Sequence, residues 1–457
     1  MSKKKTLFHL NTKPDYLFTG RQLMSLILPL IIDLFLTFFV GMLDSVMVSS
    51  VNESAVSAIS LVDQVIQLVV MVFSAMAAGG AVVAGQYLGA RRQKDACRAA
   101  GQLVWLMFFT GIFLGAAVLL FRHAILGHVF GHITKQVYSY ADKYMIIVSC
   151  SIPMLAAYQA GTAVFRTMGN SRVPMWISLM MNLINFSGNA ILIYGAGMDT
   201  NGAAVSTLVS RAAAAIVITV MLLNQNRDLH YARGLGRHPD GTLIRRILYV
   251  GIPNGLENGM FQLGKIVLLS LVALYGTSAI TANAITQNMA QIQLIPAFAV
   301  NMAVTTVIAR CVGYGDIPQV RYYNRLLLII MYAASEITAF LIYFTMPLIL
   351  SLYHASPETS RLTMQMMNWH TFAAVTLWPL AFEVPQALRA AGDVKFPMFT
   401  SMITMWFIRI LGAWILAGPA GLGALAPWIA MVMDFIARTI LYQYRWRSGK
   451  WIDKKVI

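Results

Sequence analysis

Charged residues are scarce in this chain. Among its 457 residues, 58% are hydrophobic and only 11% are charged, and the mean hydropathy is +0.66. A soluble domain carries roughly a quarter charged residues, so the supply here cannot cover a soluble surface. The composition excludes a soluble protein and predicts an all-α polytopic membrane protein.

Acidic residues are the scarcer of the two charged kinds. The chain has 18 Asp and Glu against 34 Lys and Arg, which gives a net charge of +16 and an isoelectric point near 9.8. The basic residues recur as short clusters between apolar runs, which is typical of the cytoplasmic loops of multi-pass proteins. They form no single patch, so we expect no nucleic-acid partner.

Cysteine pairs and the motifs of covalent or ATP-driven chemistry are also lacking. Cys97, Cys150 and Cys311 are scattered, without metal-ligand spacing or a paired framework. No nucleophile–base pair or ATP-binding motif appears, so we expect no enzyme, no metal centre and no cofactor beyond a coupling H+ or Na+. Residues 1–16 lack the apolar core of a signal peptide, so the first spanning helix is expected to act as the targeting signal.

Apolar runs long enough to cross a bilayer make up most of the chain. A spanning helix needs about 20 mainly apolar residues, and this criterion predicts twelve transmembrane helices. They lie near residues 22–48, 57–86, 99–121, 141–164, 174–195, 203–224, 248–274, 279–309, 324–352, 366–388, 397–417 and 421–444. We therefore expect a six-helix bundle over 1–224, a cytoplasmic linker over 225–247 and a second six-helix bundle over 248–457.

Lys and Arg divide unevenly between alternate loops. If the N-terminus is cytoplasmic, most of them fall in inside segments, and the outside loops hold only Arg122, Lys135, Lys143 and Arg361. Positive charge accumulates on the cytoplasmic side of membrane proteins. The pattern predicts a multi-pass protein of the cell membrane with both termini in the cytoplasm.

The chain repeats itself along its length. Pro29 and Pro253 lie 224 residues apart, as do Asp33 and Glu257. Each half has six spans, an even number, so the halves enter the membrane from the same side as parallel repeats around a central cavity. Rocking one bundle against the other gives alternating access, which favours a transporter.

Several segments resemble one transporter family. The paired loops FRTMGNSRVP (165–174) and LRAAGDVKFP (388–397), with LDSVMVS (43–49), AGQYLGARR (84–92) and GIPNGLENGMFQLGK (251–265), are similar to the multidrug and toxic compound extrusion (MATE) family. The resemblance implies a cation-coupled antiporter that expels organic, often cationic and amphipathic, compounds. Flippases of lipid-linked saccharides share that fold, so a flippase remains the alternative.

The resemblance also implies a coupling site in the first helix. Asp44, fifteen residues after the kinking Pro29, matches an aspartate that binds the coupling proton or sodium ion in several family members. Asn182, Asn185 and Asn189 share one face of the fifth helix by their spacing and match supporting polar positions. The additional fifth-helix aspartate of one subgroup is absent here.

Other polar residues in the spans have both a functional and a structural interpretation. A second subgroup places acids in the seventh and tenth helices, where this chain has Glu257 and Glu383, both displaced from that pattern. Asp33 and its counterpart Glu257 either bind the coupling ion or accept structural hydrogen bonds. Lys265, eight residues after Glu257, either pairs with it or contacts substrate. Amides that either line the cavity or join helices are Asn258, Gln287 and Asn288.

The charges within the spans bear on the cargo. Acids in the spans (Asp33, Asp44, Glu257, Glu336, Glu383 and Asp434) outnumber the bases (Arg211, Lys265, Arg409 and Arg438). This excess favours a cationic organic substrate over the polyanionic substrate of a flippase. A channel or receptor is disfavoured, because no repeated pore loop or large extramembrane module is present. We expect a monomer whose partners are a small organic molecule and membrane lipid.

Overall fold

The computed structural model describes residues 16–49, 53–129, 133–231, 239–353 and 355–457. Within the helices it leaves undescribed the side chains of Met42, Asp44, Ser45, Val46, Val48, Ser49 and Val129. The described residues form helices and connecting turns, with no strand among them. An all-helical fold is what a chain in hydrocarbon requires, because helices satisfy their backbone hydrogen bonds internally.

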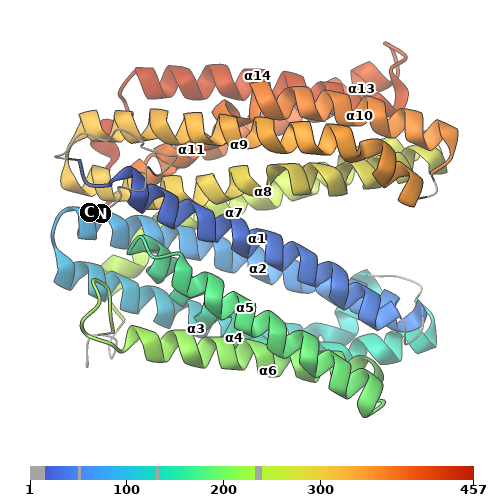
Figure 1. The fold of residues 1–457 in the computed structure, drawn as a ribbon, viewed down its shortest axis with the longest axis horizontal. Coiled ribbons are helices and arrows are strands. Elements are labelled where there is room, and N and C mark those ends of the chain that lie inside the picture. Colours follow the sequence, from blue (N-terminus) through green and yellow to red (C-terminus); the bar gives the residue numbers. More distant parts are fainter. Residues whose placement is uncertain (1–15, 50–52, 130–132, 232–238, 354) are drawn as a thin grey trace, which may run out of the picture. The chain divides into compact units, whose positions relative to one another are not determined.

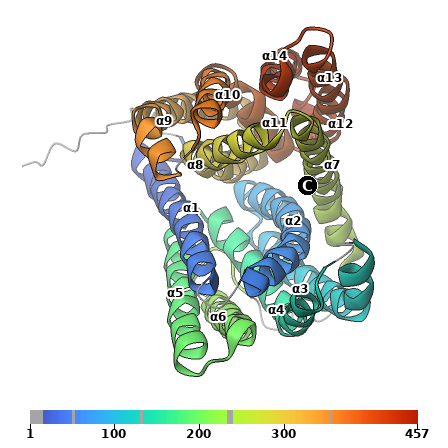
Figure 2. The same cartoon turned by 90° about the vertical axis from the view of Figure 1, so that its right-hand side faces the viewer.

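The chain forms two compact units whose boundary falls inside α7, between Gly251 and Ile252. The first unit contains α1 (Gly20–Ser49), α2 (Glu53–Gly89), α3 (Gln93–Ala124), α4 (Lys135–Thr167), α5 (Arg172–Asn189) and α6 (Asp199–Leu222). The π-helical turns η1 (Ile125–Val129) and η2 (Ala190–Gly195) extend α3 and α5. In this unit α4 packs against α2, α3 and α6, while α5 packs against α1 and α6 (Figures 1 and 2).

The second unit contains most of α7 (Gly241–Ala273) and all later helices. These are α8 (Thr277–Tyr314), α9 (Ile317–Leu352), α10 (Pro357–Thr376), α11 (Trp378–Ala391), α12 (Lys395–Ile403), η3 (Thr404–Ile410), α13 (Leu411–Ala417) and α14 (Ala426–Arg447), with the short 3₁₀ turns η4 (Gly423–Leu425) and η5 (Ile452–Lys454). Here α8 packs against α9, α10 and α11, and α14 packs against α11, η3 and α13.

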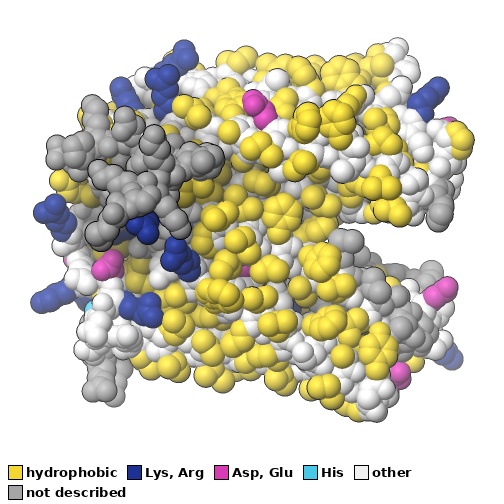
Figure 3. All heavy atoms as spheres, in the orientation of Figure 1, with side chains coloured by type: hydrophobic (Ala, Val, Ile, Leu, Met, Phe, Trp, Pro, Cys, Tyr) yellow, Lys and Arg dark blue, Asp and Glu magenta, His cyan; other side chains and the backbone are white. Residues whose placement is uncertain are grey.

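Lipid-facing surface is evident on both units. Among the described residues, eleven helices are long and apolar enough to cross a membrane. Large hydrophobic side chains point outward on them, including Phe113 (70% exposed), Phe344 (65%) and Phe407 (68%). Hydrophobic side chains cover much of the face in Figure 3. Exposure of this kind marks contact with lipid or another apolar partner, and it confirms the prediction of a multi-pass membrane protein.

The tenth predicted span, 366–388, is divided in the structure. It begins earlier, at Pro357, because the Ser356 Oγ accepts a hydrogen bond from the Thr359 N–H at 3.2 Å and caps α10. It then breaks at Leu377, and α11 starts with Trp378 followed by Pro379. A proline lacks the backbone donor that a continuous helix needs and disfavours helical geometry in the residue before it. The two helices together replace the single span.

The start of α7 also differs from the sequence-based boundary. This helix begins at Gly241, inside the segment 225–247 that the hydropathy pattern assigns to a linker. The Asp240 Oδ1 accepts hydrogen bonds from the N–H groups of Thr242 and Leu243 at 3.0 and 3.3 Å. Such a cap satisfies donors that the first turn leaves free, so the helix extends beyond its apolar stretch.

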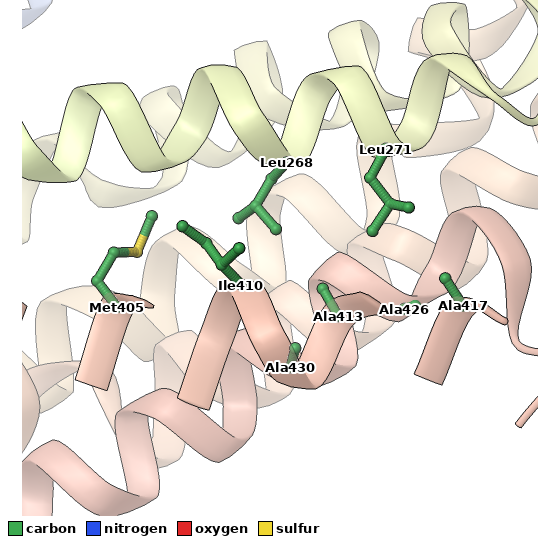
Figure 4. Close-up of a cluster of buried hydrophobic side chains, with 8 residues drawn as sticks. All are labelled: Leu268, Leu271, Met405, Ile410, Ala413, Ala417, Ala426 and Ala430. Atoms are coloured by element: carbon green, nitrogen blue, oxygen red, sulfur yellow. The ribbon is translucent and has the colours of Figure 1, made fainter. Parts of the chain in front are cut away.

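Small side chains hold α7 close to its neighbours in the second unit. A cluster of buried hydrophobic residues joins α7 to η3, α13 and α14 (Figure 4); its members are Leu268, Leu271, Met405, Ile410, Ala413, Ala417, Ala426 and Ala430. Alanines at such contacts let helix backbones approach closely in membranes. A Cβ atom at Gly264 would collide with the side chain of Met405. This packing fixes the positions of Lys265, on α7, and Arg409, on η3.

Candidate functional site

An ion pair joins α1 to the end of α4 in the first unit. The Nη2 of Arg166 lies 3.2 Å from the Oδ2 of Asp33, and Asp33 is buried. Asp33 follows Pro29 by one helical turn on α1. Arg166 lies in the last turn of α4, three residues before Gly169, whose φ is +81°. The left-handed glycine reverses the chain directly after the pair.

A corresponding ion pair joins α7 to the end of α11 in the second unit. The Nη2 of Arg389 lies 2.6 Å from both Oε1 and Oε2 of Glu257. Glu257 follows Pro253 by one turn, and Arg389 precedes Gly392, whose φ is +101°, by three residues. The two halves therefore repeat the same construction: proline, acid, arginine and left-handed glycine.

Each of these carboxylates is compensated by an arginine. A paired carboxylate has less need of an added cation, because the guanidinium already balances its charge. Lys265 was expected either to pair with Glu257 or to contact substrate. In the structure Glu257 pairs with Arg389 and not with Lys265. The Lys265 Nζ lies 5.3 Å from the centre of the Phe261 ring, and no carboxylate of the described residues lies within ion-pairing distance of it.

The three asparagines of α5 differ in their contacts. The Asn185 Nδ2 donates to the Thr207 Oγ1 at 3.3 Å, and the Ser206 Oγ donates to the backbone carbonyl of Asn185 at 2.6 Å. The Asn189 Nδ2 donates to the Asn185 Oδ1 at 3.4 Å. Asn182 is half-buried, and its Nδ2 has no hydrogen-bond partner in the described part of the chain. Two of the three amides therefore tie α5 to α6 or to each other.

Asp44 lies within the helical backbone of α1, and its side chain is outside the described residues. A hydrogen bond from η2 holds this end of α1: the Tyr194 hydroxyl donates to the backbone carbonyl of Met47 at 3.2 Å. Met47 follows Asp44 by three residues. The backbone at Asp44 thus lies at the end of α1 that packs beside the end of the α5 helix.

Glu383 is fully buried on α11. Neither of its carboxyl oxygens has a hydrogen-bond partner among the described residues. It lies two residues before Pro385 and three before Gln386, whose Nε2 donates to the Thr305 Oγ1 at 2.6 Å. An ionised carboxylate without a partner is costly to bury, so this group is suited to taking up a proton or a cation.

The remaining amides singled out from the sequence lie on α7 and α8. Asn258 and Asn288 are exposed, and Gln287 is half-buried. Their positions leave both interpretations open, since an exposed amide on a spanning helix can meet either substrate or another helix. Pro29 and Pro253 both lie inside continuous helices, where a proline removes one backbone hydrogen bond and favours a bend.

A group of cations in the second unit is not evident from sequence spacing. Lys265, Arg409 and Arg438, here called the basic cluster, surround the ring of Phe261 at 5.3, 5.7 and 5.6 Å from its centre. They come from α7, η3 and α14, so only the packing of these helices brings them together. The spacing of four residues between Asp434 and Arg438 predicts their pairing, and the 2.7 Å contact confirms it.

The first unit contains an acid that the sequence-based count omits. Asp63, on α2, interacts electrostatically with Arg211 on α6. The Nη1 of Arg211 also donates to the Ser151 Oγ at 2.8 Å. Asp63 falls inside the predicted span 57–86, and its presence in an apolar run is the signal that could have identified it.

Comparison with known proteins places the chain in a family. The MatE family model matches residues 29–191 and again residues 253–415. The second match begins 224 residues after the first, the spacing of Pro29 and Pro253, which confirms the duplication. The chain is 28% identical to the Uncharacterized transporter YisQ of Bacillus subtilis, over 95% of each chain. It is 27% identical to the Probable multidrug resistance protein NorM of Thermotoga maritima, over 96% of this chain and 94% of that protein.

Solved structures confirm the fold. One, described as the outward-facing conformation of a multidrug resistance MATE family transporter of the MOP superfamily, superposes with a TM-score of 0.86 at 17% identity and covers 95% of this chain and 97% of that chain. The architecture is thus that of two repeated helical lobes. With a family model that matches both halves and relatives that match nearly the whole length, the chain belongs to the MATE family of membrane transporters.

Proposed function

We propose that this transporter is a secondary antiporter that uses an inward proton or sodium gradient to expel amphipathic organic compounds. Ion coupling is supported by the burial of Glu383, a carboxyl group that is fully buried and has no hydrogen-bond partner among the described residues. Acids kept inside membrane proteins are costly and commonly mark ion or proton paths. Family membership and the multidrug-resistance names of relatives support the efflux of organic compounds.

The four candidate coupling acids divide into two kinds. Asp33 and Glu257 are neutralised by Arg166 and Arg389, and we propose that these pairs brace the first helix of each half against the end of its fourth span. Asp44 and Glu383 are the proposed coupling acids. Asp44 rests on the family resemblance and on its place in α1 beside α5, where Asn182 would support the ion. Coupling requires that the ion bind one conformation better than the other.

The charges within the spans are more evenly balanced than the sequence-based count indicates. The excess of acids over bases in the spans favours cationic compounds, but that count leaves out Asp63, and also Arg166 and Arg389, which the structure pairs with two of the acids; with these included, seven acids stand against six bases. The balance therefore does not select cations by itself. Flipping of a lipid-linked saccharide is the alternative, favoured by one observation, the basic cluster.

We further propose that the protein acts as a monomer with both termini in the cytoplasm.

Transport in proteoliposomes tests this proposal. The purified protein is reconstituted, and efflux of a fluorescent aromatic dye is followed under a proton gradient alone and a sodium gradient alone. One of the two gradients is expected to accelerate efflux, and Glu383→Gln and Asp44→Asn are expected to abolish that acceleration. Glu336→Gln, which changes an exposed acid of α9, is the matched control and should transport normally.

A further inference from the structure

We propose that the basic cluster of the second unit binds the anionic group of an aromatic organic compound, such as an aromatic carboxylate. This goes beyond the proposed antiport, because it assigns a ligand chemistry to residues that the coupling mechanism does not use. Lys265 and Arg409 are the members of this cluster that would contact the anion, His370 lies beside them, and Phe261 and Trp428 are the aromatic neighbours.

The charges around Phe261 do not balance. Arg438 is held by Asp434 at 2.7 Å, and the Nη1 of Arg409 lies 3.9 Å from the same carboxylate. One acid therefore serves two arginines, and Lys265 adds a third cation. A further acid that acts electrostatically on Arg438, Glu257, is itself compensated by Arg389. Buried cations without a counter-charge are unfavourable, so a bound anion would stabilise this arrangement.

Polar groups without a hydrogen-bond partner among the described residues lie in the same neighbourhood. Arg409 is 6% exposed, and its Nε has no hydrogen-bond partner among the described residues. His370 is 4% exposed, and both of its ring nitrogens are without a partner in the described part of the chain. Arg409 and Lys265 both act electrostatically on His370, so the three groups belong to one neighbourhood. Buried polar groups are rarely left unsatisfied, and those that are need an explanation.

The surroundings suit a ligand with an aromatic body. The His370 ring meets the Trp428 ring edge-on at 5.8 Å, and Phe261 is flanked by all three cations of the basic cluster. Lys265 is half-buried, whereas Arg409 and Arg438 are buried, so Lys265 is the cation that an entering ligand would meet first. An anion paired with a guanidinium and stacked on aromatic rings combines charge-assisted hydrogen bonding with apolar contact.

The backbone at Arg409 is unusual. Arg409 lies in η3, a seven-residue π-helical segment between α12 and α13. π-Helical turns are rare and occur frequently at functional sites, because the wider turn shifts the side chains that follow it. Here the wider turn places Arg409 between the rings of Phe261 and Phe435, at 5.7 and 5.8 Å.

The test is a binding measurement on the full-length protein in phosphatidylcholine nanodiscs, without any ion gradient. 2-Naphthoate is titrated and its binding measured by isothermal calorimetry, with 2-naphthylmethylammonium as the cationic counterpart of the same size. The wild-type protein is expected to bind naphthoate in preference to the ammonium compound. Lys265→Met should weaken naphthoate binding by about tenfold, the scale of one hydrogen bond to a charged group, whereas Lys265→Arg should retain it.

Lys395→Met, which removes an exposed lysine of the same unit, is the matched control and should leave naphthoate binding unchanged. Equal affinity in the wild type and Lys265→Met, absence of naphthoate binding, or preference for the ammonium compound would each overturn the site. Adding phosphatidylglycerol to the nanodiscs identifies the source of the anion. If phosphatidylglycerol weakens naphthoate binding to the wild type but not to Lys265→Met, the site binds a lipid headgroup. If phosphatidylglycerol leaves naphthoate binding unchanged, the site binds a soluble organic anion. Because no gradient is used, failure of ion coupling would leave this result intact.

Discussion

The Nη2 of Arg389 lies 2.6 Å from both carboxylate oxygens of Glu257, and a corresponding pair joins the Nη2 of Arg166 to one carboxylate oxygen of Asp33, Oδ2, at 3.2 Å. In each half the acid follows a proline by one turn, and the arginine precedes a left-handed glycine by three residues. Gene duplication thus retained an ion pair together with the chain reversal beside it. This retention indicates a structural role shared by both halves.

Breaking the second pair should destabilise the protein. Glu257→Gln or Arg389→Gln alone leaves a nearly buried charge unpaired, at a cost of about 3 kcal/mol or more, and the double variant should cost less than the sum of the two. Thermal unfolding of the four proteins in detergent measures this coupling. Additive losses would show that the contact contributes nothing.

Breaking the Asp33–Arg166 pair should also destabilise the protein, but by less than breaking the Glu257–Arg389 pair. Arg166 is more exposed than Arg389, with 23% against 13% of its side chain accessible, and its contact is longer. Solvent screens such a pair, so Asp33→Asn is expected to lower the unfolding temperature less than Glu257→Gln. A larger loss for Asp33→Asn would contradict the comparison.

The asparagines of α5 allow a matched test of interhelical hydrogen bonding. Asn185→Ala removes the side-chain contacts to Ser206, Thr207 and Asn189 and keeps the bond from the Ser206 Oγ to the backbone carbonyl. Hydrogen bonds between membrane helices contribute about 0.6 kcal/mol each, so a loss of roughly 1–2 kcal/mol is expected. Asn182→Ala, whose Nδ2 has no partner among the described residues, should leave the unfolding temperature nearly unchanged.

Gly392 should tolerate no side chain. Its φ of +101° is unfavourable for other residues, and a Cβ there would collide with the backbone carbonyl of Lys454. Gly392→Ala is expected to reduce the yield of folded protein sharply. In Gly412→Ala the new Cβ would meet that of Ala430 at 3.8 Å, an ordinary contact, so normal yield is expected there. Comparable yields would refute the argument from backbone geometry.

The sequence predicts the spans well because each depends on its own apolar length. It also predicts the Asp434–Arg438 pair, which needs only one helical turn. The pairing of Asp33 with Arg166 was not predicted, since the repeat aligns the two arginines and the two acids without bringing them together. The basic cluster requires three helices to pack, and the π-helical turn that carries Arg409 has no simple sequence pattern. The break at Leu377 did have a signal, Pro379.

The most direct test of the central claim is gradient-driven efflux from proteoliposomes by the wild type, Asp44→Asn, Glu383→Gln and Glu336→Gln. The account predicts that one imposed gradient, of protons or of sodium ions, accelerates dye efflux by the wild type and by Glu336→Gln. It predicts that Asp44→Asn and Glu383→Gln show only the slow, gradient-independent flux. Full acceleration in both of these variants, or no response of the wild type to either gradient, would contradict it.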